Sequence, residues 1–327
     1  MRTFLTSAAL ALLAGSAAAQ TPTLTVYTYD SFVAEWGPGP QIEAAFEETC
    51  GCDLNFVSAG DGAALLARVR LEGERTEADI VLGLDTSLTE AATATGLFAE
   101  HGGAPADLTV PVEWNDPIFL PYDWSHFAFI YDETRLSEPP ASFRELAESD
   151  LSVVIQDPRS STPGLSLVFW VKAAYGDEAQ AMWEALAPRI LTVTKGWSES
   201  YSMFLEGEAD MVLSYTTSPA YHMVAEEDDT KHAAPFTEGH YTQVEVAGIL
   251  KSTDQPDLAR DFMAFMLTDA FQSIIPTTNW MYPAVATELD PAFGKLITPE
   301  KALLFPPEEA EALRKTAIEE WQEALSQ

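Results

Sequence analysis

The chain has 327 residues, a length typical of about two domains. Hydrophobic residues make up 47% of the sequence and aromatic residues 11%, which excludes a wholly disordered chain. The 17 basic and 51 acidic residues give a formal net charge of −34, which argues against binding to nucleic acid phosphates or anionic lipid surfaces. Two cysteines are too few for a structural zinc site or a disulfide framework.

Residues 1–19 have the pattern of a secretion signal. One arginine precedes an apolar stretch from Phe4 to Leu13, and Ala17 and Ala19 supply the small residues of a cleavage site. The apolar stretch is shorter than the roughly 20 residues that a membrane-spanning helix needs. The sequence therefore predicts cleavage before Gln20 and a soluble, periplasmic mature protein.

Strand and helix patterns alternate three times in the first part of the mature chain. β-Branched and aromatic residues predict the strands, and apolar residues at helical spacing predict the helices. Asp61 is suited to cap a helix at its N-terminus, and Gly73 is suited to end it. In chain order the expected elements are a strand at 24–29, a helix at 42–49, a strand at 54–57, a helix at 61–73, a strand at 79–82 and a helix ending near Gly96.

The second part repeats this alternation. Ser142 and Glu145 form a capping box for a short helix. Strands are expected at 127–131, 153–155, 191–194, 210–213 and 244–247. Helices are expected from about 160 through 175, near 178–187, 198–206 and 218–225, as one long helix from Gln255 to Ile275, and at 307–325.

This order predicts an α/β fold of two lobes joined by a hinge, each lobe a mixed, mostly parallel sheet flanked by helices. Pro121–Tyr131 and Tyr241–Leu250 are the expected crossing strands. Lobe 1 is expected to comprise residues 20–122 and about 245–278, and lobe 2 residues 123–244 and about 279–327. Because ligands in open α/β sheets bind at the carboxyl ends of strands, the site is expected in the cleft between the lobes.

Three turns at predicted strand ends are suited to binding an anion. They offer free backbone N–H groups and hydroxyls at helix starts, where a phosphate can bind. Ordinary helix capping is the alternative for each turn taken alone. The turns are Gly60-Asp61-Gly62, Ser161-Thr162-Pro163-Gly164 and the run Tyr215-Thr216-Thr217-Ser218-Pro219.

Aromatic residues gather in the same turn contexts. Their faces could stack on a flat or cationic ligand, although each one alone could equally be an ordinary core or surface residue. Asp30, at the end of the first strand, could neutralise a cation or simply cap a turn. The aromatic residues are Trp197, Tyr215, Tyr221, Trp280 and Tyr282.

These motifs resemble those of the periplasmic thiamine-binding proteins of bacterial ABC importers. The similar runs cover nearly the whole mature chain, and TKGWS at 194–198 together with LSYTTSPAYH at 213–222 are the most specific. Further runs lie at 24–32, 36–40, 78–85, 156–159, 161–164, 238–241 and 279–283, and the Cys50-x-Cys52 pair also fits the pattern.

The resemblance implies a type II periplasmic binding fold without catalysis or a cofactor. It implies that the lobes close on thiamine, thiamine monophosphate or thiamine diphosphate, and that a membrane permease recognises the closed form. Four aromatic residues would stack on the ligand rings, hydroxyls and amides would bind its hydroxyethyl or phosphate end, and Asp30 would face the aminopyrimidine or the thiazolium. The implied ligand-binding residues are Asp30, Asp61, Gly62, Ser161, Thr162, Trp197, Tyr215, Thr216, Thr217, Ser218, Tyr221 and Trp280.

Two alternatives stay open at this stage. A thiamine-degrading enzyme would need a cysteine nucleophile, and only Cys50 and Cys52 are available, in a polar turn where they could form a small, strained disulfide. A ferric-ion or other cation carrier of the same fold would use clustered tyrosines. Here Tyr215 and Tyr221 are not adjacent, and the five histidines are scattered without metal-ligand spacing.

Overall fold

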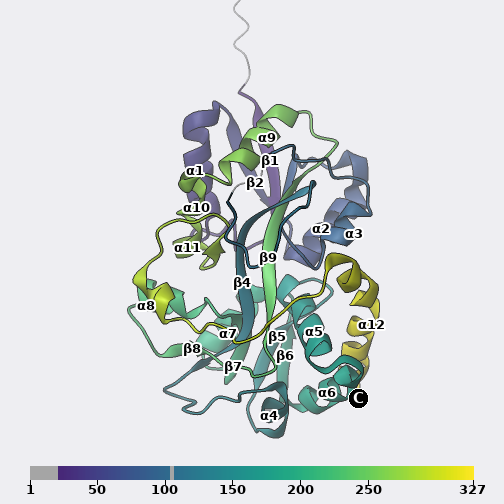
Figure 1. The fold of residues 1–327 in the computed structure, drawn as a ribbon, viewed down its shortest axis with the longest axis vertical. Coiled ribbons are helices and arrows are strands. Elements are labelled where there is room, and N and C mark those ends of the chain that lie inside the picture. Colours follow the sequence, from purple (N-terminus) through teal and green to yellow (C-terminus); the bar gives the residue numbers. More distant parts are fainter. Residues whose placement is uncertain (1–20, 104–106) are drawn as a thin grey trace, which may run out of the picture.

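The computed structural model describes residues 21–103 and 107–327 (Figure 1). The predicted leader at 1–19 and the predicted first mature residue, Gln20, lie outside these residues. Within the described ranges, no helix has the length and apolar character needed to cross a membrane.

Eight strands form one continuous, curled sheet in the order β2-β1-β3-β9-β4-β7-β5-β6. The pairs at both ends of this order are parallel, and the central pairs that involve β4 and β9 are antiparallel. The strands, including three short ones that pair with β4 or β9, are β1 (Thr23–Thr28), β2 (Asp53–Ser58), β3 (Ile80–Asp85), β4 (Phe119–Asp132), β5 (Val153–Gln156), β6 (Ile190–Thr194), β7 (Met211–Tyr215), β8 (Lys231–Ala233), β9 (His240–Ile249), β10 (Tyr282–Pro283) and β11 (Ala302–Leu303).

Helices cover both faces of this sheet, as the alternating pattern predicted. They are α1 (Gly39–Cys50), α2 (Gly62–Glu72), α3 (Thr89–Thr93), α4 (Phe143–Glu148), α5 (Thr162–Tyr175), α6 (Ala179–Leu186), α7 (Trp197–Leu205), α8 (Pro219–Ala225), α9 (Pro256–Phe265), α10 (Asp269–Gln272), α11 (Ile275–Thr278) and α12 (Pro307–Leu325).

Strands β4 and β9 connect the two lobes, and Figure 1 shows them side by side along the long axis of the molecule. Residues 119–126 of β4 pair with β9, and residues 127–131 pair with β7. This confirms the two predicted crossing strands. We call the half that contains β1, β2 and β3 lobe 1 and the half that contains β5, β6 and β7 lobe 2; the residue boundaries of the lobes stay a prediction.

The sheet of lobe 1 is buried on both faces. In β3, Ile80 and Leu82 belong to the cluster under α1 and α9, whereas Val81 and Leu84 belong to the cluster under α2 and α3. Such near-continuous burial is typical of strands covered by helices on both sides, and it explains the apolar run at 80–82.

The single long helix predicted from Gln255 to Ile275 is wrong. The chain instead forms α9, α10 and α11, and between α9 and α10 Thr268 leaves helical geometry with φ −87° and ψ 158°. The aromatic residues of this segment pack inward: Phe262 and Phe265 contact Phe46 of α1, and Phe271 contacts Tyr122. Tertiary packing therefore overrides the helical period of the sequence.

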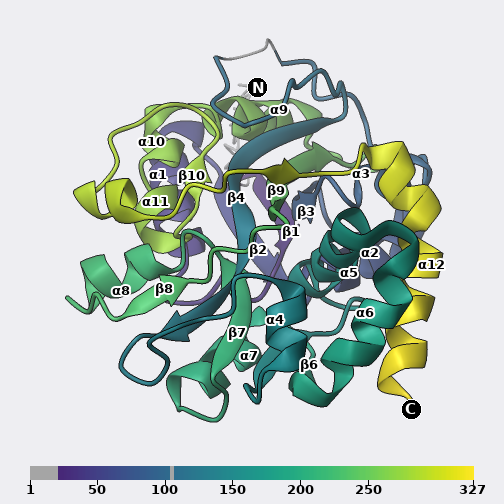
Figure 2. The ribbon, with the colours of Figure 1, turned by 60° about the horizontal axis from the view of Figure 1, so that its bottom comes forward.

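Helix α12 lies along the outer side of α5 and α6 (Figure 2). Trp321 and Ala317 are buried, and the Lys172 ammonium of α5 donates to Glu320 at 2.7 Å. The helix also contacts α3 of lobe 1. The chain thus ends on a helix that touches both lobes.

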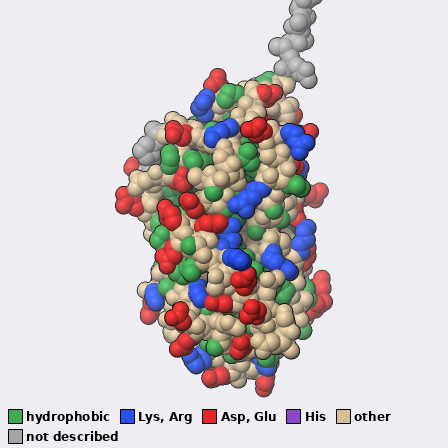
Figure 3. All heavy atoms as spheres, turned by 90° about the vertical axis from the view of Figure 1, so that its right-hand side faces the viewer, with side chains coloured by type: hydrophobic (Ala, Val, Ile, Leu, Met, Phe, Trp, Pro, Cys, Tyr) green, Lys and Arg blue, Asp and Glu red, His purple; other side chains and the backbone are tan. Residues whose placement is uncertain are grey.

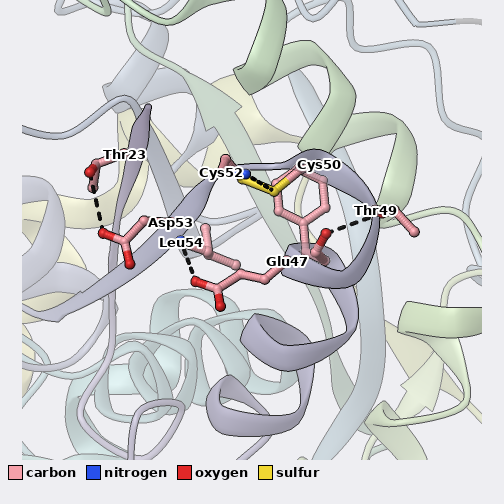
Figure 4. The surroundings of a disulfide bond; sticks show 8 residues. Thr23, Glu47, Thr49, Cys50, Cys52, Asp53 and Leu54 are labelled. Atoms are coloured by element: carbon pink, nitrogen blue, oxygen red, sulfur yellow. Dashed lines mark hydrogen bonds between the residues drawn. A yellow bond between two sulfur atoms is a disulfide. The ribbon is translucent and has the colours of Figure 1, made fainter. Parts of the chain in front are cut away.

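Cys50 and Cys52 form a disulfide that joins the end of α1 to the start of β2 (Figure 4). The Leu54 amide donates to the Glu47 carboxylate at 2.8 Å and ties the same two elements together. Neither sulfur is a free thiol in this structure.

Charges of both signs lie intermixed on the face drawn in Figure 3. The 51 acidic residues of the chain therefore do not form one continuous acidic surface on this side. The net charge of −34 favours solubility and gives no information about the ligand.

Candidate functional site

A cavity of about 510 Å³ lies between the lobes. It is of the size that small-molecule sites occupy, and both lobes contribute to its wall. Lobe 1 and its associated helices contribute Tyr29, Ser31, Trp36, Asp61, Glu245, Thr277, Thr278, Asn279, Trp280 and Met281. Lobe 2 contributes Thr162, Pro163, Trp197, Ser198, Tyr201, Ser202, Leu205, Tyr215, Ser218, Tyr221 and Ala225.

Stacked aromatic rings form the lobe 2 side of the cavity. Trp197 begins α7 directly after the extended Gly196, and its indole N–H donates to the Ser214 hydroxyl at 2.8 Å. Its ring lies on Tyr201 with centroids 4.8 Å apart and planes 22° apart. Trp36 approaches Trp197 from lobe 1 at 6.4 Å. These rings offer flat faces to a ligand between the lobes.

Trp280 closes another part of the wall and has an unusual backbone. Its φ of 57° is left-handed, which costs a residue with a side chain about 1–3 kcal/mol. The Trp280 amide donates to Ile275 O at 3.1 Å, so this conformation ends α11. Its ring meets Tyr221 edge to face at 5.4 Å. A strained residue at a cavity is typical of a binding site.

A hydrogen-bond network behind the wall fixes two of the tyrosines. The Tyr201 hydroxyl bonds to His222 Nε2 at 2.9 Å, and His222 Nδ1 donates to the Glu226 carboxylate at 2.7 Å. The Tyr221 hydroxyl donates to the other oxygen of Glu226 at 3.0 Å. Burial lowers the pKa of His222, which favours the neutral ring that this network requires.

His222, Glu226 and Asp228 also form a candidate metal-ligand cluster, since one potential ligand atom from each lies within 4.8 Å of the others. Lys231 competes for this position, because its ammonium donates to Asp228 at 2.9 Å. His222 is meanwhile committed to Tyr201 and Glu226. The arrangement therefore serves to hold the tyrosines rather than to offer an open metal site.

Buried carboxyl groups form the floor of the cavity. The Tyr29 hydroxyl donates to Glu245 at 3.1 Å, and Asn279 Nδ2 donates to Asp123 at 2.6 Å. Burial raises the pKa of Glu245 to about 7 and that of Asp61 to about 6. Burial and the neighbouring Glu245 raise the pKa of Asp123 well above its ordinary value. Among the described residues that line the cavity, none is Lys or Arg.

Gly83 allows Tyr29 to reach this floor. A Cβ atom at position 83 would lie 2.2 Å from the Tyr29 ring, and the φ of Gly83 is 105°. The glycine also lies at the irregularity where β3 shifts its register against β9. The tyrosine position therefore depends on a residue without a side chain.

The two lobes touch around the cavity. The Ser161 hydroxyl of lobe 2 donates to the Asp61 carboxylate at 2.6 Å, and the Ala64 amide donates to Ser160 O at 3.0 Å. Gly62 lies so close to Thr162 that a Cβ there would be 1.9 Å from Thr162 Oγ1. The structure thus describes a closed cleft.

The structure brings seven of the predicted ligand-binding residues to the cavity wall: Asp61, Thr162, Trp197, Tyr215, Ser218, Tyr221 and Trp280. Gly62 and Ser161 lie behind Asp61 and Thr162 at the contact between the lobes. Thr216 and Thr217 are buried, and their hydroxyls bond to Ser125. Asp30 is exposed, and it accepts hydrogen bonds from the Gly60 amide at 3.1 Å and from the Ser58 hydroxyl.

Asp123 and Glu245 were not predicted from the sequence. In the sequence each is the one acidic residue of its predicted crossing strand, at 121–131 and 241–250, and that isolated charge was the signal that could have identified them. Tyr29 and Asn279 stood in strand-end and motif positions but were given no role. Tyr201 was part of a predicted helix and was not singled out.

Comparison with known proteins agrees with this geometry. The family described as "Bacterial extracellular solute-binding protein" matches residues 26–273. The "Thiamine-binding periplasmic protein" of Escherichia coli K12 is 53% identical over 307 residues, which cover 93% of this chain and 94% of that protein. A solved "Periplasmic thiamin binding protein" has a TM-score of 0.92 and 52% identity, and the match covers 94% of this chain and 97% of that chain.

A more distant likeness concerns the fold alone. The ferric binding protein of Campylobacter jejuni has a TM-score of 0.74 at 19% identity, covering 92% of this chain and 99% of that chain. At this identity the likeness shows a shared fold, and a fold alone does not determine the ligand. On the family match and the close relatives, the chain belongs to the bacterial extracellular solute-binding proteins.

Proposed function

We propose that this protein captures thiamine in the cavity between its lobes and delivers it to the membrane permease of an ABC importer. The observation that carries the proposal is an aromatic-walled cavity between the touching lobes, whose floor bears carboxyl groups and whose described lining has no Lys or Arg. Such a cavity suits a flat organic cation, because aromatic faces and carboxylates both attract positive charge. The names of the close relatives support the same ligand.

The seven predicted residues that line the cavity are our proposed thiamine contacts. Trp197, Tyr215, Tyr221 and Trp280 would stack on the two rings. Thr162 and Ser218 would face the hydroxyethyl end; the Thr162 hydroxyl is buried and accepts or donates no hydrogen bond within the described chain. Thiamine monophosphate and thiamine diphosphate are proposed as further ligands because they carry the same two rings.

Transport would follow from closure of the cleft. Contacts such as Ser161 to Asp61 form only when the lobes meet, so a ligand that contacts both lobes shifts the population towards the closed state. The permease would recognise that state. We also propose that residues 1–19 are removed on export and that the mature chain acts in the periplasm.

The relatives named above are binding proteins rather than enzymes, and the disulfide gives a physical reason against thiol catalysis here. A cysteine nucleophile must be a free thiolate, whereas Cys50 and Cys52 are bonded to each other and neither lines the cavity.

The test is calorimetric titration of thiamine into protein that has been unfolded, dialysed and refolded to remove bound ligand. We expect one-to-one binding with submicromolar affinity and no consumption of thiamine. Titration of both phosphates then ranks the ligands, and titration of ferric ion tests the main alternative. Absence of heat with thiamine in a sample of verified fold would refute the proposal, and cleavage of thiamine would indicate an enzyme.

A further inference from the structure

Asp123 and Glu245 face each other across the two crossing strands. They are direct register partners in the antiparallel pairing of β4 with β9. Their side chains are buried, with Asp123 0% and Glu245 6% exposed. Glu245 lines the cavity, whereas Asp123 lies behind it. Any charge on this pair is therefore held at the connection between the lobes and beside the ligand.

Neutral hydrogen-bond donors contact the pair, but no cation does so among the described residues. Tyr29 donates to Glu245 and Asn279 donates to Asp123, while Asp123 Oδ1 is buried without a hydrogen bond. The Tyr122 hydroxyl donates to that of Tyr29 at 3.4 Å.

The other titratable groups around the pair are acids and phenols. Asp61, at the start of α2, and Tyr215 of β7 lie near the pair. Asp85 of β3 is the register partner of Glu245 on its other side. Arg314 of α12 acts on Asp85 and is not among the groups that act on Glu245 or Asp123.

Two buried carboxylates this close repel each other, so both cannot be ionised without a cation beside them. We propose that Asp123 and Glu245 share one proton in the ligand-free protein, and that the pair releases this proton when the cationic ligand enters beside Glu245. The inference rests on the proposed function and adds to it: the ligand supplies the positive charge that the protein lacks at this position. Binding then becomes an exchange of a proton for an organic cation.

The direction of the pH dependence follows from this exchange. Burial raises the pKa of both carboxyl groups in the empty cavity, and a cation beside the pair lowers it. Below the raised pKa of the empty pair a bound ligand displaces up to one proton, so thiamine affinity rises with pH by at most about tenfold per pH unit and levels off once the empty pair has lost its proton. Burial raises the pKa values of Tyr29, Tyr122 and Tyr215 above their ordinary value, so these phenols stay protonated.

The test measures the protons released on binding. Thiamine is titrated calorimetrically at pH 6.5 in buffers of different ionisation enthalpy, and the slope of the observed heat gives the proton count. We expect release of about 0.7 to 1 proton in the unmodified protein and about a third of that or less in Glu245→Gln. Asp61→Asn should keep about two thirds or more of the proton release of the unmodified protein, because the pKa of Asp61 is lower than that of the pair, at about 6.

Glu184→Gln on the exposed surface of α6 is the matched control and should release as many protons as the unmodified protein. Thiamine binding without proton release in the unmodified protein would overturn the inference, as would equal release in Glu245→Gln. Neither result would refute thiamine binding itself.

Infrared difference spectroscopy gives a second measurement that needs no variant to fold. At pH 6.5 the ligand-free protein should show a carboxylic-acid C=O band that disappears when thiamine binds. Burial also raises the pKa of Asp85 to about 7, and this group should keep its proton when thiamine binds. Its band should therefore be present in both the ligand-free and the bound spectrum and cancel in the difference. A difference spectrum without loss of a carboxylic-acid band would overturn the shared proton. If thiamine does not bind, the proposed function fails, but titration of the band in the empty protein still tests the pair.

Discussion

The two sides of the cavity are built from different chemistry. The lobe 2 side presents rings and hydroxyls held by neutral hydrogen bonds, such as that from Trp197 to Ser214. The opposite side and the floor carry Asp61 and Glu245, with Asp123 beside Glu245 on the neighbouring strand. We expect the aromatic side to favour any flat molecule and the carboxyl side to discriminate by charge.

This difference indicates how affinity and specificity are divided. Stacking contributes to binding without regard to sign of charge, because every planar ligand has a face to offer. Buried carboxyls destabilise the empty protein unless they are protonated, and they stabilise a bound cation. We therefore expect substitutions on the floor to change which ligands bind, and substitutions on the aromatic side to change how tightly any of them binds.

The largest effect is expected for Glu245→Lys. The lysine ammonium would lie against Asp123, where we expect the positive charge of the ligand. It would therefore repel a cationic ligand from the cavity. We expect thiamine affinity to fall at least about 100-fold, measured by calorimetric titration. Circular dichroism and thermal unfolding verify the fold. A dissociation constant within threefold of the unmodified protein would contradict the charge role of the floor.

Trp197→Ala tests the aromatic side. Removal of the indole takes away the face that stacks on Tyr201 and borders the cavity. We expect thiamine binding to weaken by about 1–3 kcal/mol in titrations of the folded variant. Trp197→Phe is the control, since it keeps an aromatic face and loses the hydrogen bond to Ser214. Equal affinity in Trp197→Ala would remove this side chain from the site.

Gly62→Ala tests closure rather than ligand contact. The new methyl group would lie 1.9 Å from Thr162 Oγ1 and 2.9 Å from Gly83 O, so the lobes could not approach fully. We expect thiamine affinity to fall about five- to tenfold, and thermal stability to fall as well because Gly83 O belongs to the same lobe as Gly62. Gly294→Ala is the matched control, because nothing lies within 4 Å of a Cβ there.

The double variant Gly62→Ala/Thr162→Ala removes the nearest obstructing atom. It should recover part of the affinity that Gly62→Ala loses. A loss in Gly294→Ala as large as that in Gly62→Ala would mean that alanine at these positions acts through something other than closure.

Local sequence patterns predicted the aromatic side of the site better than the floor. Trp197, Tyr215 and Tyr221 stand next to strand ends, and the strand-then-helix order brings such ends to one edge of the sheet. Asp123 and Glu245 lie far apart in the sequence, and only the antiparallel pairing of β4 with β9 brings them together. No periodicity within either strand identifies that pair.

The same limit applies to the fold. Alternating strands and helices, the crossing strands and α12 were predicted because each has its own local pattern. The division of 255–275 into separate helices was not predicted, because it depends on Phe46 and Tyr122 as distant packing partners. The position of Asp30 at a strand end suited either ligand binding or a turn cap, and in the structure its carboxylate accepts hydrogen bonds from Ser58 and Gly60.

The smallest effect is expected behind the aromatic side, in Glu226→Gln. Both carboxylate oxygens of Glu226 accept hydrogen bonds, one from Tyr221 and one from His222, and a glutamine offers only one acceptor in the same shape. We expect thiamine affinity to fall about two- to fivefold, because Tyr201 and Tyr221 lose part of their positioning. Glu227→Gln is the matched control, as its exposed neighbour outside this network. If both variants bind thiamine as the unmodified protein does, the rings are held by packing alone and the network has no part in binding.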